Sequence, residues 1–314
     1  MSQQKTVRIY GTSPLVAWGI AGIALIFLAC TAAAVISIFL SSFSRGVRNT
    51  ISGELLFTSD RDGKREIYRL SGRGVERITF TSGDSESWDA VETPDGSILF
   101  TSNRDGKREI YRLIGDETKR ITFTPGSAES WDPAVETSGS FLFTSNRDGK
   151  REVYRLTGQT GERITFTPGS AESWDAEPAG PNNILFTSNR DGKREVYRLA
   201  GQDSTRITFT PGSAESWEGA PESGSATFLF TSNRDGKAEI YRITGANTVR
   251  VTVSEGTSDD LGAYQSWAAV PIFGGFLFTT DRDGQPEIYR ITGQNSEKLT
   301  ASPPGKASWT AWSE

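Results

Sequence analysis

The stretch FLFTSNRDGKREVYRL, residues 141–156, recurs six times along the chain with few changes. Its central phenylalanine marks the copies, which are centred on Phe57, Phe100, Phe143, Phe186, Phe230 and Phe278. Successive copies lie 43, 43, 43, 44 and 48 residues apart. Repetition at such a period is typical of a chain in which copies of one structural unit are joined in series.

Each unit is expected to contain four short strands, as in residues 130–136, 140–146, 151–157 and 161–167. These segments are rich in the aromatic and β-branched side chains that half-buried strands prefer. An Asn-Arg-Asp-Gly turn separates the second strand from the third, and its glycine supplies the positive φ that a tight hairpin needs. Four strands in about 43 residues match the period of a β-propeller blade.

The two ends of the repeat region predict a closed ring. The first copy begins with its second strand, at residues 54–60, and the last copy ends near Leu299. Residues 307–314 then repeat the first strand alone. Six complete blades result only if this C-terminal strand joins the first blade, and closure also removes exposed sheet edges. The sequence therefore predicts an all-β, closed six-bladed β-propeller with four antiparallel strands per blade.

A resemblance to a known family rests on two consecutive motifs. FTSNRDGKREIYRL at residues 100–113 and RITFTPGSAESWDPA at 120–134 resemble the WD40-like repeat of TolB-type propellers. The resemblance covers residues 53–314 and implies a six-bladed, usually extracytoplasmic module that binds proteins. TolB itself carries an α/β domain ahead of its propeller, whereas this chain has an apolar segment there. The role of TolB in the envelope Tol–Pal system is therefore not carried over.

An uncharged, mostly apolar run of 26 residues precedes the repeats, at residues 15–40. As a helix it would extend roughly 39 Å at ~1.5 Å per residue, enough to cross a bilayer with some tilt. The alternative is a lipoprotein signal that ends at Cys30. The domains expected on the first interpretation are a tail at 1–13, a single transmembrane helix at 14–43, a linker at 44–52 and the propeller at 53–314.

The predicted anchor also suggests a location and a helix-packing face. Basic residues flank both of its ends, but the short N-terminal tail is easily kept in the cytoplasm. We therefore expect a single-pass protein of the cell membrane with its propeller on the extracytoplasmic side, in the periplasm or at the cell surface. Small residues recur at every fourth position, which either lets a second helix pack closely or is a chance alignment. They are Ala29, Ala33, Ser37 and Ser41.

Composition and charge disfavour several classes of function. The chain has no histidine and one cysteine, which removes the commonest general base and any cysteine-cluster metal site. No nucleophile elbow or phosphate-binding glycine loop is present, so we expect neither an enzyme nor a bound cofactor. The net charge is −5, and the first 50 residues carry +4, which leaves −9 on the repeat region. This charge disfavours nucleic acid as a partner.

Acidic residues flank the Ser-Trp pair at the start of the first strand in four blades. They are Glu86, Asp89, Glu129, Asp132, Glu172, Asp175, Glu215 and Glu218. Around the mouth of a central channel they would bind a cation or a basic peptide segment. The alternative, which we favour, is that they pair with arginines and lysines of the neighbouring Asn-Arg-Asp-Gly-Lys loops. The arginines of these loops, such as Arg147, are expected to form solvated ion pairs.

The connection between the fifth and sixth copies is about seven residues longer than its counterparts. Such a departure from the repeat marks either a contact for a partner or Ca²⁺, or simple drift in loop length. Its candidate residues are Glu255, Asp259, Asp260 and Tyr264.

These patterns together predict a membrane-anchored, extracytoplasmic propeller. We expect it to act as a protein-binding scaffold or accessory subunit of a membrane or envelope complex. One alternative is a ligand- or Ca²⁺-binding sensor at the channel mouth. A less favoured alternative is a propeller enzyme based on carboxylate chemistry.

Overall fold

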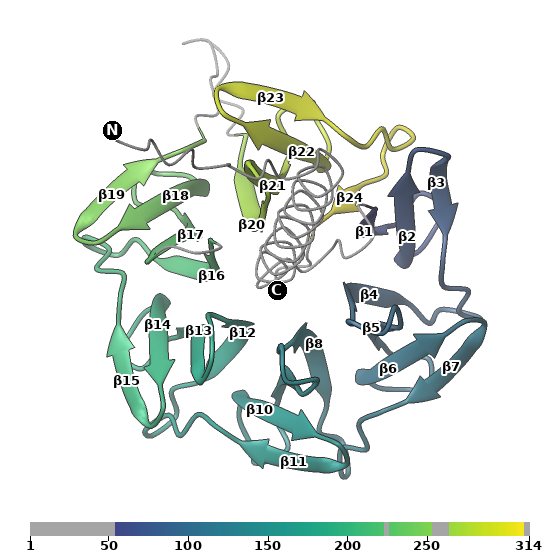
Figure 1. The fold of residues 1–314 in the computed structure, drawn as a ribbon, viewed down its shortest axis with the longest axis horizontal. Coiled ribbons are helices and arrows are strands. Elements are labelled where there is room, and N and C mark those ends of the chain that lie inside the picture. The colour runs from purple at the N-terminus through teal and green to yellow at the C-terminus, as the bar shows by residue number, and fades with distance from the viewer. Residues whose placement is uncertain (1–53, 223–225, 253–263, 311–314) are drawn as a thin grey trace, which may run out of the picture. The chain divides into compact units, whose positions relative to one another are not determined.

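The computed structural model describes residues 54–222, 226–252 and 264–310, which form six sheets (Figure 1). Within these ranges no helix is long and apolar enough to cross a membrane. The predicted tail, transmembrane helix, lipoprotein signal and linker lie outside the described residues. So do several predicted contact residues, which are Ala29, Ala33, Ser37, Ser41, Glu255, Asp259 and Asp260.

Each sheet is a blade of four antiparallel strands, which follow one another from the centre of the ring outward (Figure 1). Blade one contains β24 (Ser308–Trp309), β1 (Leu55–Ser59), β2 (Glu66–Ser71) and β3 (Gly74–Arg77). Blade two contains β4 (Ser87–Glu92), β5 (Ile98–Ser102), β6 (Glu109–Ile114) and β7 (Glu117–Arg120). Blade three contains β8 (Ser130–Val135), β9 (Phe141–Ser145), β10 (Glu152–Thr157) and β11 (Thr160–Arg163).

The remaining three blades repeat this order. Blade four contains β12 (Ser173–Pro178), β13 (Asn183–Ser188), β14 (Glu195–Ala200) and β15 (Asp203–Arg206). Blade five contains β16 (Ser216–Pro221), β17 (Thr227–Ser232), β18 (Glu239–Thr244) and β19 (Asn247–Arg250). Blade six contains β20 (Ser266–Ile272), β21 (Gly275–Thr280), β22 (Glu287–Thr292) and β23 (Asn295–Lys298). The predicted count of six four-stranded blades is confirmed.

The phenylalanine and tyrosine of the repeat stack across neighbouring strands inside each blade. In blade three Phe143 is the cross-strand partner of Tyr154, and their ring centroids are 5.6 Å apart. The Tyr154 hydroxyl donates a hydrogen bond to Asp148 Oδ2 over 2.6 Å. Gly149 follows with a φ of 95°, which residues with a side chain rarely adopt. The Asp-Gly turn therefore fixes both the hairpin and the orientation of a buried tyrosine.

Apolar side chains fill the space between adjacent blades. One cluster joins Leu142 of blade three to Phe186 of blade four. A corresponding cluster joins Leu55 of blade one to Val270 and Leu277 of blade six. The first and last blades are thus packed together like any other neighbouring pair.

The C-terminal strand completes blade one, which confirms the predicted closure of the ring. β24 pairs with β1 in an antiparallel register that places Ser308 opposite Ser59. The backbone N–H of Ala307 donates to Asp60 Oδ1 over 2.7 Å. Within the described part of the chain, which ends here at residue 310, β24 pairs with β1 through its two residues Ser308 and Trp309.

The outermost strand of each blade is shorter than the sequence predicts. β11 ends at Arg163, so the prediction of a strand over residues 161–167 is wrong beyond that residue. The hydroxyls of Thr165 and Thr167 instead donate to Glu152 Oε2 over 2.6 and 2.8 Å. Bonds to a buried carboxylate therefore replace the strand ladder where the chain leaves one blade for the next.

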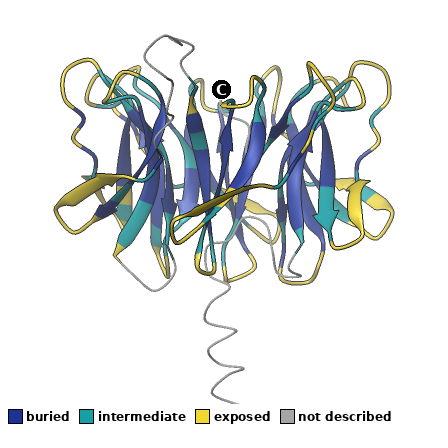
Figure 2. Cartoon of the chain, turned by 90° about the horizontal axis from the view of Figure 1, so that it is seen from above, coloured by how far each residue is buried: buried dark blue, intermediate teal, exposed yellow. Residues whose placement is uncertain are grey.

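The ring has two faces with different connections (Figure 2). The loop face carries the turns between the second and third strands, such as residues 146–151, and the connections between blades, such as residues 164–172. The hairpin face carries the turns that join the first strand to the second and the third strand to the fourth. The predicted acidic residues before and within the first strand therefore belong to the loop-face half of the ring.

Candidate functional site

Four of the predicted acidic residues are held by arginines of the preceding blade. Glu129 accepts hydrogen bonds from the backbone N–H of Arg108 over 3.0 Å and from its Nε over 2.8 Å. The Arg108 guanidinium also lies 4.2 Å from the ring centroid of Trp131. We call this arrangement the Arg–Glu clasp, and it recurs as Arg65–Glu86, Arg151–Glu172 and Arg194–Glu215. The sequence favoured pairing with the arginine and lysine of the Asn-Arg-Asp-Gly-Lys loops, but the partner in the structure is the arginine that directly follows each loop, such as Arg108.

Three of the clasps favour the ionised form of their glutamate, namely those of Glu86, Glu172 and Glu215. Partial burial opposes ionisation of Glu86, Glu172 and Glu215, but the hydrogen bonds and charge of the paired arginine outweigh it. The net effect lowers the pKa of each carboxyl below its ordinary value. A carboxylate satisfied by arginine has less capacity to bind a cation, so the clasps favour a structural role for these four residues.

The last two blade junctions lack both halves of the clasp. Gln265 and Ala307 stand at the glutamate position, and Ala238 and Pro286 stand at the arginine position. Removal of one partner alone would leave a partly buried charge uncompensated, which is costly. Glutamate and arginine therefore change together, as expected of one structural unit.

The second set of predicted acidic residues lies at a bulge of the innermost strand. Asp132 has a φ of 58° and occupies the register shift between Trp131 and Ala134. Its backbone N–H donates to Thr101 Oγ1 of the preceding blade over 3.0 Å. Equivalent bonds run from Asp89, Asp175, Glu218, Ala268 and Thr310 to Thr58, Thr144, Thr187, Thr231 and Thr279, respectively. These six bonds, the inter-blade belt, close a circuit around the ring.

Two side chains of this second set also bond to described threonines. Glu218 Oε2 accepts hydrogen bonds from Thr231 Oγ1 and from the backbone N–H of Ala268, both over 2.9 Å. Asp175 Oδ2 accepts a longer one, of 3.4 Å, from Thr187 Oγ1. The structure therefore separates the two acidic residues of each motif, because the first binds an arginine and the second lies at the belt.

The structure also bears on the metal and long-loop predictions. Across residues 54–222, 226–252 and 264–310, no group of three or more acidic or cysteine side chains is placed to hold a metal ion.

Tyr264 is half-buried just before β20, and it is the one residue of the long-connection set within the described part of the chain. A role for it in partner binding stays a prediction.

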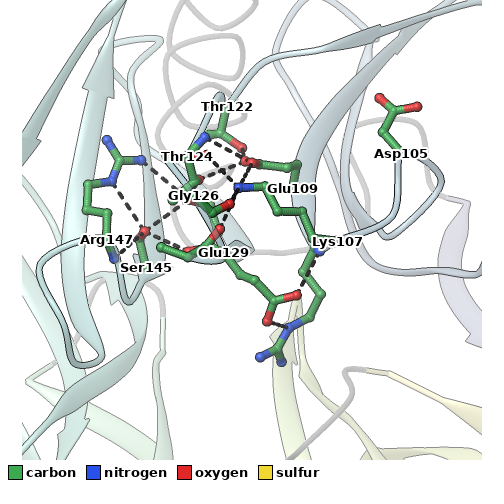
Figure 3. A network of polar contacts seen from close by, with 12 residues as sticks. Asp105, Lys107, Glu109, Thr122, Thr124, Gly126, Glu129, Ser145 and Arg147 are labelled. Carbon is green, nitrogen blue, oxygen red and sulfur yellow. Dashed lines mark hydrogen bonds and ion pairs between the residues drawn. The ribbon is translucent and has the colours of Figure 1, made fainter.

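A fully buried glutamate at the start of each third strand escaped prediction. Glu109 is inaccessible to solvent, and its Oε1 accepts a hydrogen bond from Arg120 Nη2 over 2.6 Å. Its Oε2 accepts from the hydroxyls of Thr122 and Thr124 over 2.6 and 2.9 Å (Figure 3). The equivalent residues are Glu66, Glu152, Glu195, Glu239 and Glu287. The signal in the sequence is the presence of this glutamate in all six copies.

A lysine extends this network to the loop face. Lys107 Nζ lies 3.5 Å from Glu109 Oε1 and donates to the carbonyl oxygen of Gly126 over 2.8 Å (Figure 3). Glu109 also accepts the backbone N–H of Thr124 over 2.9 Å. The connection between blades two and three is thus held at several points and presents its exposed residues in a fixed position.

The loop arginines lie on aromatic rings where solvated ion pairs were expected. The Arg147 guanidinium is 5.2 Å from the ring centroid of Phe143 and 4.7 Å from that of Tyr154. Its Nε donates to Ser145 Oγ over 3.2 Å (Figure 3). Each loop arginine therefore covers the interior of its own blade rather than forming a surface of free charge.

A second feature missed from the sequence is a set of exposed phenylalanines on the connections that leave four consecutive blades. Phe80, Phe123, Phe166 and Phe209 are 73%, 74%, 74% and 68% exposed. The guanidiniums of Arg77, Arg120, Arg163 and Arg206 lie 4.8, 4.9, 4.9 and 4.2 Å from their ring centroids. We call these eight residues the Phe–Arg rim. The sequence has Val253 and Ala301 at the equivalent positions of blades five and six.

Three of the four units of the Phe–Arg rim are built on the buried glutamates, because Arg77, Arg120 and Arg163 donate to Glu66, Glu109 and Glu152. Arg120 donates to Glu109 through Nη2 and to the carbonyl oxygen of Thr122 through Nε, over 2.8 Å in the latter case. Its guanidinium is therefore fixed, and the Phe123 ring rests against a fixed cation. Each of these three units offers an exposed ring beside an arginine that hydrogen bonds hold in place. In the fourth unit Arg206 Nη1 instead donates to Asp191 Oδ2 over 3.2 Å, and its buried Nε has no hydrogen-bond partner among the described residues.

Comparison with solved structures identifies the fold. Putative TolB from Agrobacterium tumefaciens is 21% identical, with a TM-score of 0.51 over 63% of this chain and 81% of that chain. TolB from Acinetobacter baumannii is 18% identical, with a TM-score of 0.55 over 84% and 68%. Catalytically inactive virginiamycin B lyase from Staphylococcus aureus, solved with quinupristin, is 14% identical, with a TM-score of 0.56 over 76% and 77%.

These similarities show that the chain has the propeller fold of TolB-type proteins, as the resemblance in the sequence implies. The identities are low, in agreement with a protein that is not TolB itself. The sequence matches no family model and no curated protein. Because a lyase shares the fold, the similarity alone assigns neither a binding role nor an enzymatic one.

Proposed function

We propose that this protein is a membrane-anchored, extracytoplasmic propeller that binds protein partners as a scaffold or accessory subunit of a membrane complex. The observation that carries the proposal is the Phe–Arg rim. Four rings that are 68% to 74% exposed recur on consecutive blades, each beside an arginine. Aromatic residues and arginine are enriched in protein–protein interfaces and supply most residues with large binding contributions.

The rigidity of the rim supports the same proposal. Binding is weakened by the entropy lost when mobile side chains become ordered. Here the hydrogen bonds of Arg120 to Glu109 and to the Thr122 carbonyl hold the cation before any partner arrives. A partner that covers Phe123 would therefore order few additional groups. Because blades five and six lack the phenylalanine, contact is expected on one arc of the ring.

Membrane anchoring is the second part of the proposal. Residues 15–40 are uncharged and long enough to span a bilayer. A single span would hold the propeller at one side of the membrane and raise its local concentration near membrane partners. The stripe of small residues in that segment, Ala29, Ala33, Ser37 and Ser41, would face a helix of the complex.

A sensor at the channel mouth is the alternative. It would use the second acidic set, Asp89, Asp132, Asp175 and Glu218, since arginine occupies the first set. Glu218 accepts one hydrogen bond from Thr231 of its own blade and one from the backbone of Ala268 in blade six, which favours a structural role for that set as well. An enzyme based on carboxylates is less favoured for the same reason.

Affinity purification from mild detergent tests the proposed function. The full chain, tagged and expressed in its source cells, should recover a defined set of proteins that mass spectrometry identifies. The double variant Phe123→Ser, Phe166→Ser should lose those proteins, because both rings are largely exposed and their removal leaves the core intact. Ile114→Ser is the matched control, since Ile114 is 50% exposed on β6 but lies outside the rim.

Equal recovery by the double variant and by the control would contradict a binding role for the Phe–Arg rim. Circular dichroism and thermal unfolding of both variants establish that each propeller is folded. Recovery that depends instead on Asp132 and Asp175, tested by charge reversal to lysine, would favour the sensor. Sedimentation of the chain with membranes that resists alkaline carbonate tests the anchor separately.

A further inference from the structure

One arginine of the Phe–Arg rim has fewer carboxylates around it than the other three. In blades one to three each rim arginine lies within 4.0 Å of two carboxylates, one buried and one in the Asp-Gly turn. Arg163, for example, lies 2.7 Å from Glu152 and 3.5 Å from Asp148. Among the described residues Arg206 of blade four lies this close to one carboxylate, that of Asp191 at 3.2 Å. Its charge is therefore compensated less than that of its three counterparts.

The hydrogen-bond donors of Arg206 are also used less. Arg163 donates from Nε to the carbonyl oxygen of Thr165 and from Nη2 to Glu152. Within the described part of the chain the Arg206 guanidinium makes one hydrogen bond, from Nη1 to Asp191 Oδ2. Its side chain is 27% exposed, so an acceptor on a partner can reach the unused Nη2. A guanidinium has five N–H donors, and a donor that is left without an acceptor away from water is unfavourable.

The buried glutamate of blade four is satisfied without this arginine. Glu195 Oε2 accepts hydrogen bonds from the hydroxyls of Thr208 and Thr210 over 2.6 and 2.8 Å. Its Oε1 accepts one from the backbone N–H of Thr210 over 2.9 Å and lies 3.7 Å from Lys193 Nζ. Arg206 is therefore available to another anion without leaving a buried carboxylate unpaired.

The surroundings of Arg206 combine apolar surface with a second cation. The Phe209 ring is 68% exposed, and its centroid lies 4.2 Å from the guanidinium. Pro211, which follows two residues later, is exposed as well. Arg190 Nη1 donates to Ser204 Oγ over 2.9 Å, and Ser204 lies on the same side of β15 as Arg206 because the two are two residues apart. Arginines form strong, charge-assisted hydrogen bonds with carboxylates.

We infer that Arg206 and Phe209 form a subsite for an acidic side chain, aspartate or glutamate, of a protein partner, with an apolar side chain of the same partner on the Phe209 ring. This inference rests on the proposed binding role of the Phe–Arg rim. The carboxylate accepts a hydrogen bond from Arg206 Nη2. In blades one to three the arginines are held by the buried glutamates, so those units take apolar groups alone. Arg206 thereby determines which part of the partner lies on blade four.

A peptide library tests the inference. Nonapeptides with leucine at the centre and every residue type at the other positions are passed over the full chain, immobilised in mild detergent, and the retained peptides are sequenced. We expect Asp and Glu to be enriched over Asn and Gln at a position beside the leucine. The enrichment should disappear in Arg206→Gln.

Arg198→Gln is the matched control. Arg198 is an exposed residue of β14 in the same blade, and it donates to Asn183 Oδ1 over 3.1 Å. Tyr197, the residue before it, is the cross-strand partner of Arg206, so Arg198 points to the opposite face of the blade. The control removes the same charge and should leave the enrichment unchanged. Equal loss in both variants would show a general attraction of acidic peptides and would overturn the inference.

The affinity of one enriched peptide gives the size of the effect. Fluorescence polarisation compares this peptide with its acid-to-amide analogue on the wild type and on Arg206→Gln. Either change should weaken binding about ten-fold, since a hydrogen bond to a charged group contributes that much or more. Both changes together should cause no further loss, because they remove one contact. Independent, additive losses would contradict a contact between the carboxylate and Arg206.

Unfolding in urea distinguishes this role from a structural one. Arg206→Gln should leave the urea midpoint unchanged, because Glu195 keeps its bonds to Thr208 and Thr210. Arg163→Gln should lower the midpoint, because Glu152 loses its bond from Nη2. A midpoint lowered equally by both substitutions would assign Arg206 to the fold and overturn the inference.

The results separate this inference from the proposal on which it rests. Absence of acidic enrichment in the wild type, while Phe123→Ser, Phe166→Ser still loses its proteins, would overturn the inference alone. Enrichment that depends on Arg206, with unchanged protein recovery by that double variant, would support the inference and contradict the role proposed for Phe123 and Phe166. Equal peptide retention by the wild type and by Phe209→Ser would contradict both.

Discussion

Arg120 Nη2 donates a hydrogen bond to Glu109 Oε1 over 2.6 Å and so joins the outermost strand of blade two to a carboxylate without solvent exposure. Lys107 Nζ, 3.5 Å from the same oxygen, adds a second positive charge. Two threonine hydroxyls bind the other oxygen. A charge this deeply buried is tolerated only with such partners, so the contact couples the blade interior to the connection that follows.

Removal of this carboxylate should be strongly destabilising. In Glu109→Ala, the cation of Arg120 and the hydroxyls of Thr122 and Thr124 lose their acceptor. Removing one partner of a buried ion pair and leaving the other unpaired lowers the free energy of unfolding by roughly 3–5 kcal/mol. We expect a loss of that order in the free energy of unfolding, measured with urea.

A surface pair provides the control for that substitution. Glu117 lies 3.2 Å from Lys119 Nζ, and both side chains are more than half exposed. Glu117→Ala should change the free energy of unfolding by less than about 0.5 kcal/mol. Similar losses for Glu109→Ala and Glu117→Ala would show that the buried network contributes little.

Acid should weaken the blade junctions through the clasps. The pKa values of Glu86, Glu172 and Glu215 are lowered in the folded protein from an ordinary value of 4.5. A lowered folded pKa means that the stabilisation is fully present above the unfolded pKa and is lost as the pH falls through the folded one. The melting temperature should therefore decrease as the pH is lowered past about 4.5.

Neutral replacements identify the share of the clasps in this acid sensitivity. The triple variant Arg65→Gln, Arg151→Gln, Arg194→Gln removes the charges that lower these pKa values. Its melting temperature at pH 7 should be lower than that of the wild type. Its melting temperature should also change less between pH 5 and pH 3. Parallel curves for wild type and variant would assign the acid sensitivity to other carboxylates.

Truncation at the seam should open the ring. A chain that ends at residue 304 loses β24, including the Ala307 N–H bond to Asp60 and the pairing of Ser308 with Ser59. Several hydrogen bonds at ~1 kcal/mol each amount to a loss of about 3 kcal/mol or more, and the apolar junction of blades one and six becomes accessible. Urea unfolding and limited proteolysis measure both effects. An unchanged urea midpoint would mean that β24 does not hold the ring closed.

Glycine should be tolerated better at Ala268 than at its neighbour. Ala268 has a φ of 54°, and a side chain in this left-handed region costs roughly 1–2 kcal/mol. Ala268→Gly relieves that strain, which offsets the loss of a buried methyl group. Ala269→Gly loses a similarly buried methyl without such relief. Calorimetry should show Ala268→Gly as the more stable variant by about 1 kcal/mol, and the reverse order would exclude strain at the bulge.

The fold was largely predictable because the repeat pattern fixes it. The period, the Asp-Gly turns and the leftover strand at residues 307–314 together require six blades and a C-terminal closure. The clasp was predictable in part, since Glu129 and the loop that contains Arg108 are expected on one face of adjacent blades. The exact partner depended on packing, because the guanidinium also stacks on Trp131.

The features that escaped prediction depend on contacts between distant residues. Thr165 and Thr167 alternate with larger side chains as in a strand, and only the folded structure shows that they bind Glu152. The exposure of Phe123 was equally hidden, because an aromatic residue in such a pattern is normally assigned to a core. In both cases the cause is the buried glutamate. Its hydrogen bonds to the threonines end the outermost strand, and the phenylalanine between them faces solvent.

The inter-blade belt gives the ring no preferred starting point. Every junction uses the same donor and acceptor, a backbone N–H of the innermost strand and a threonine hydroxyl of the blade before it, and the seam uses them too, between Thr310 and Thr279. A circularly permuted chain, opened at another junction and joined across the present one, would therefore make the same set of bonds. The order of the blades along the polypeptide then decides where the chain enters the ring, and the architecture does not depend on it.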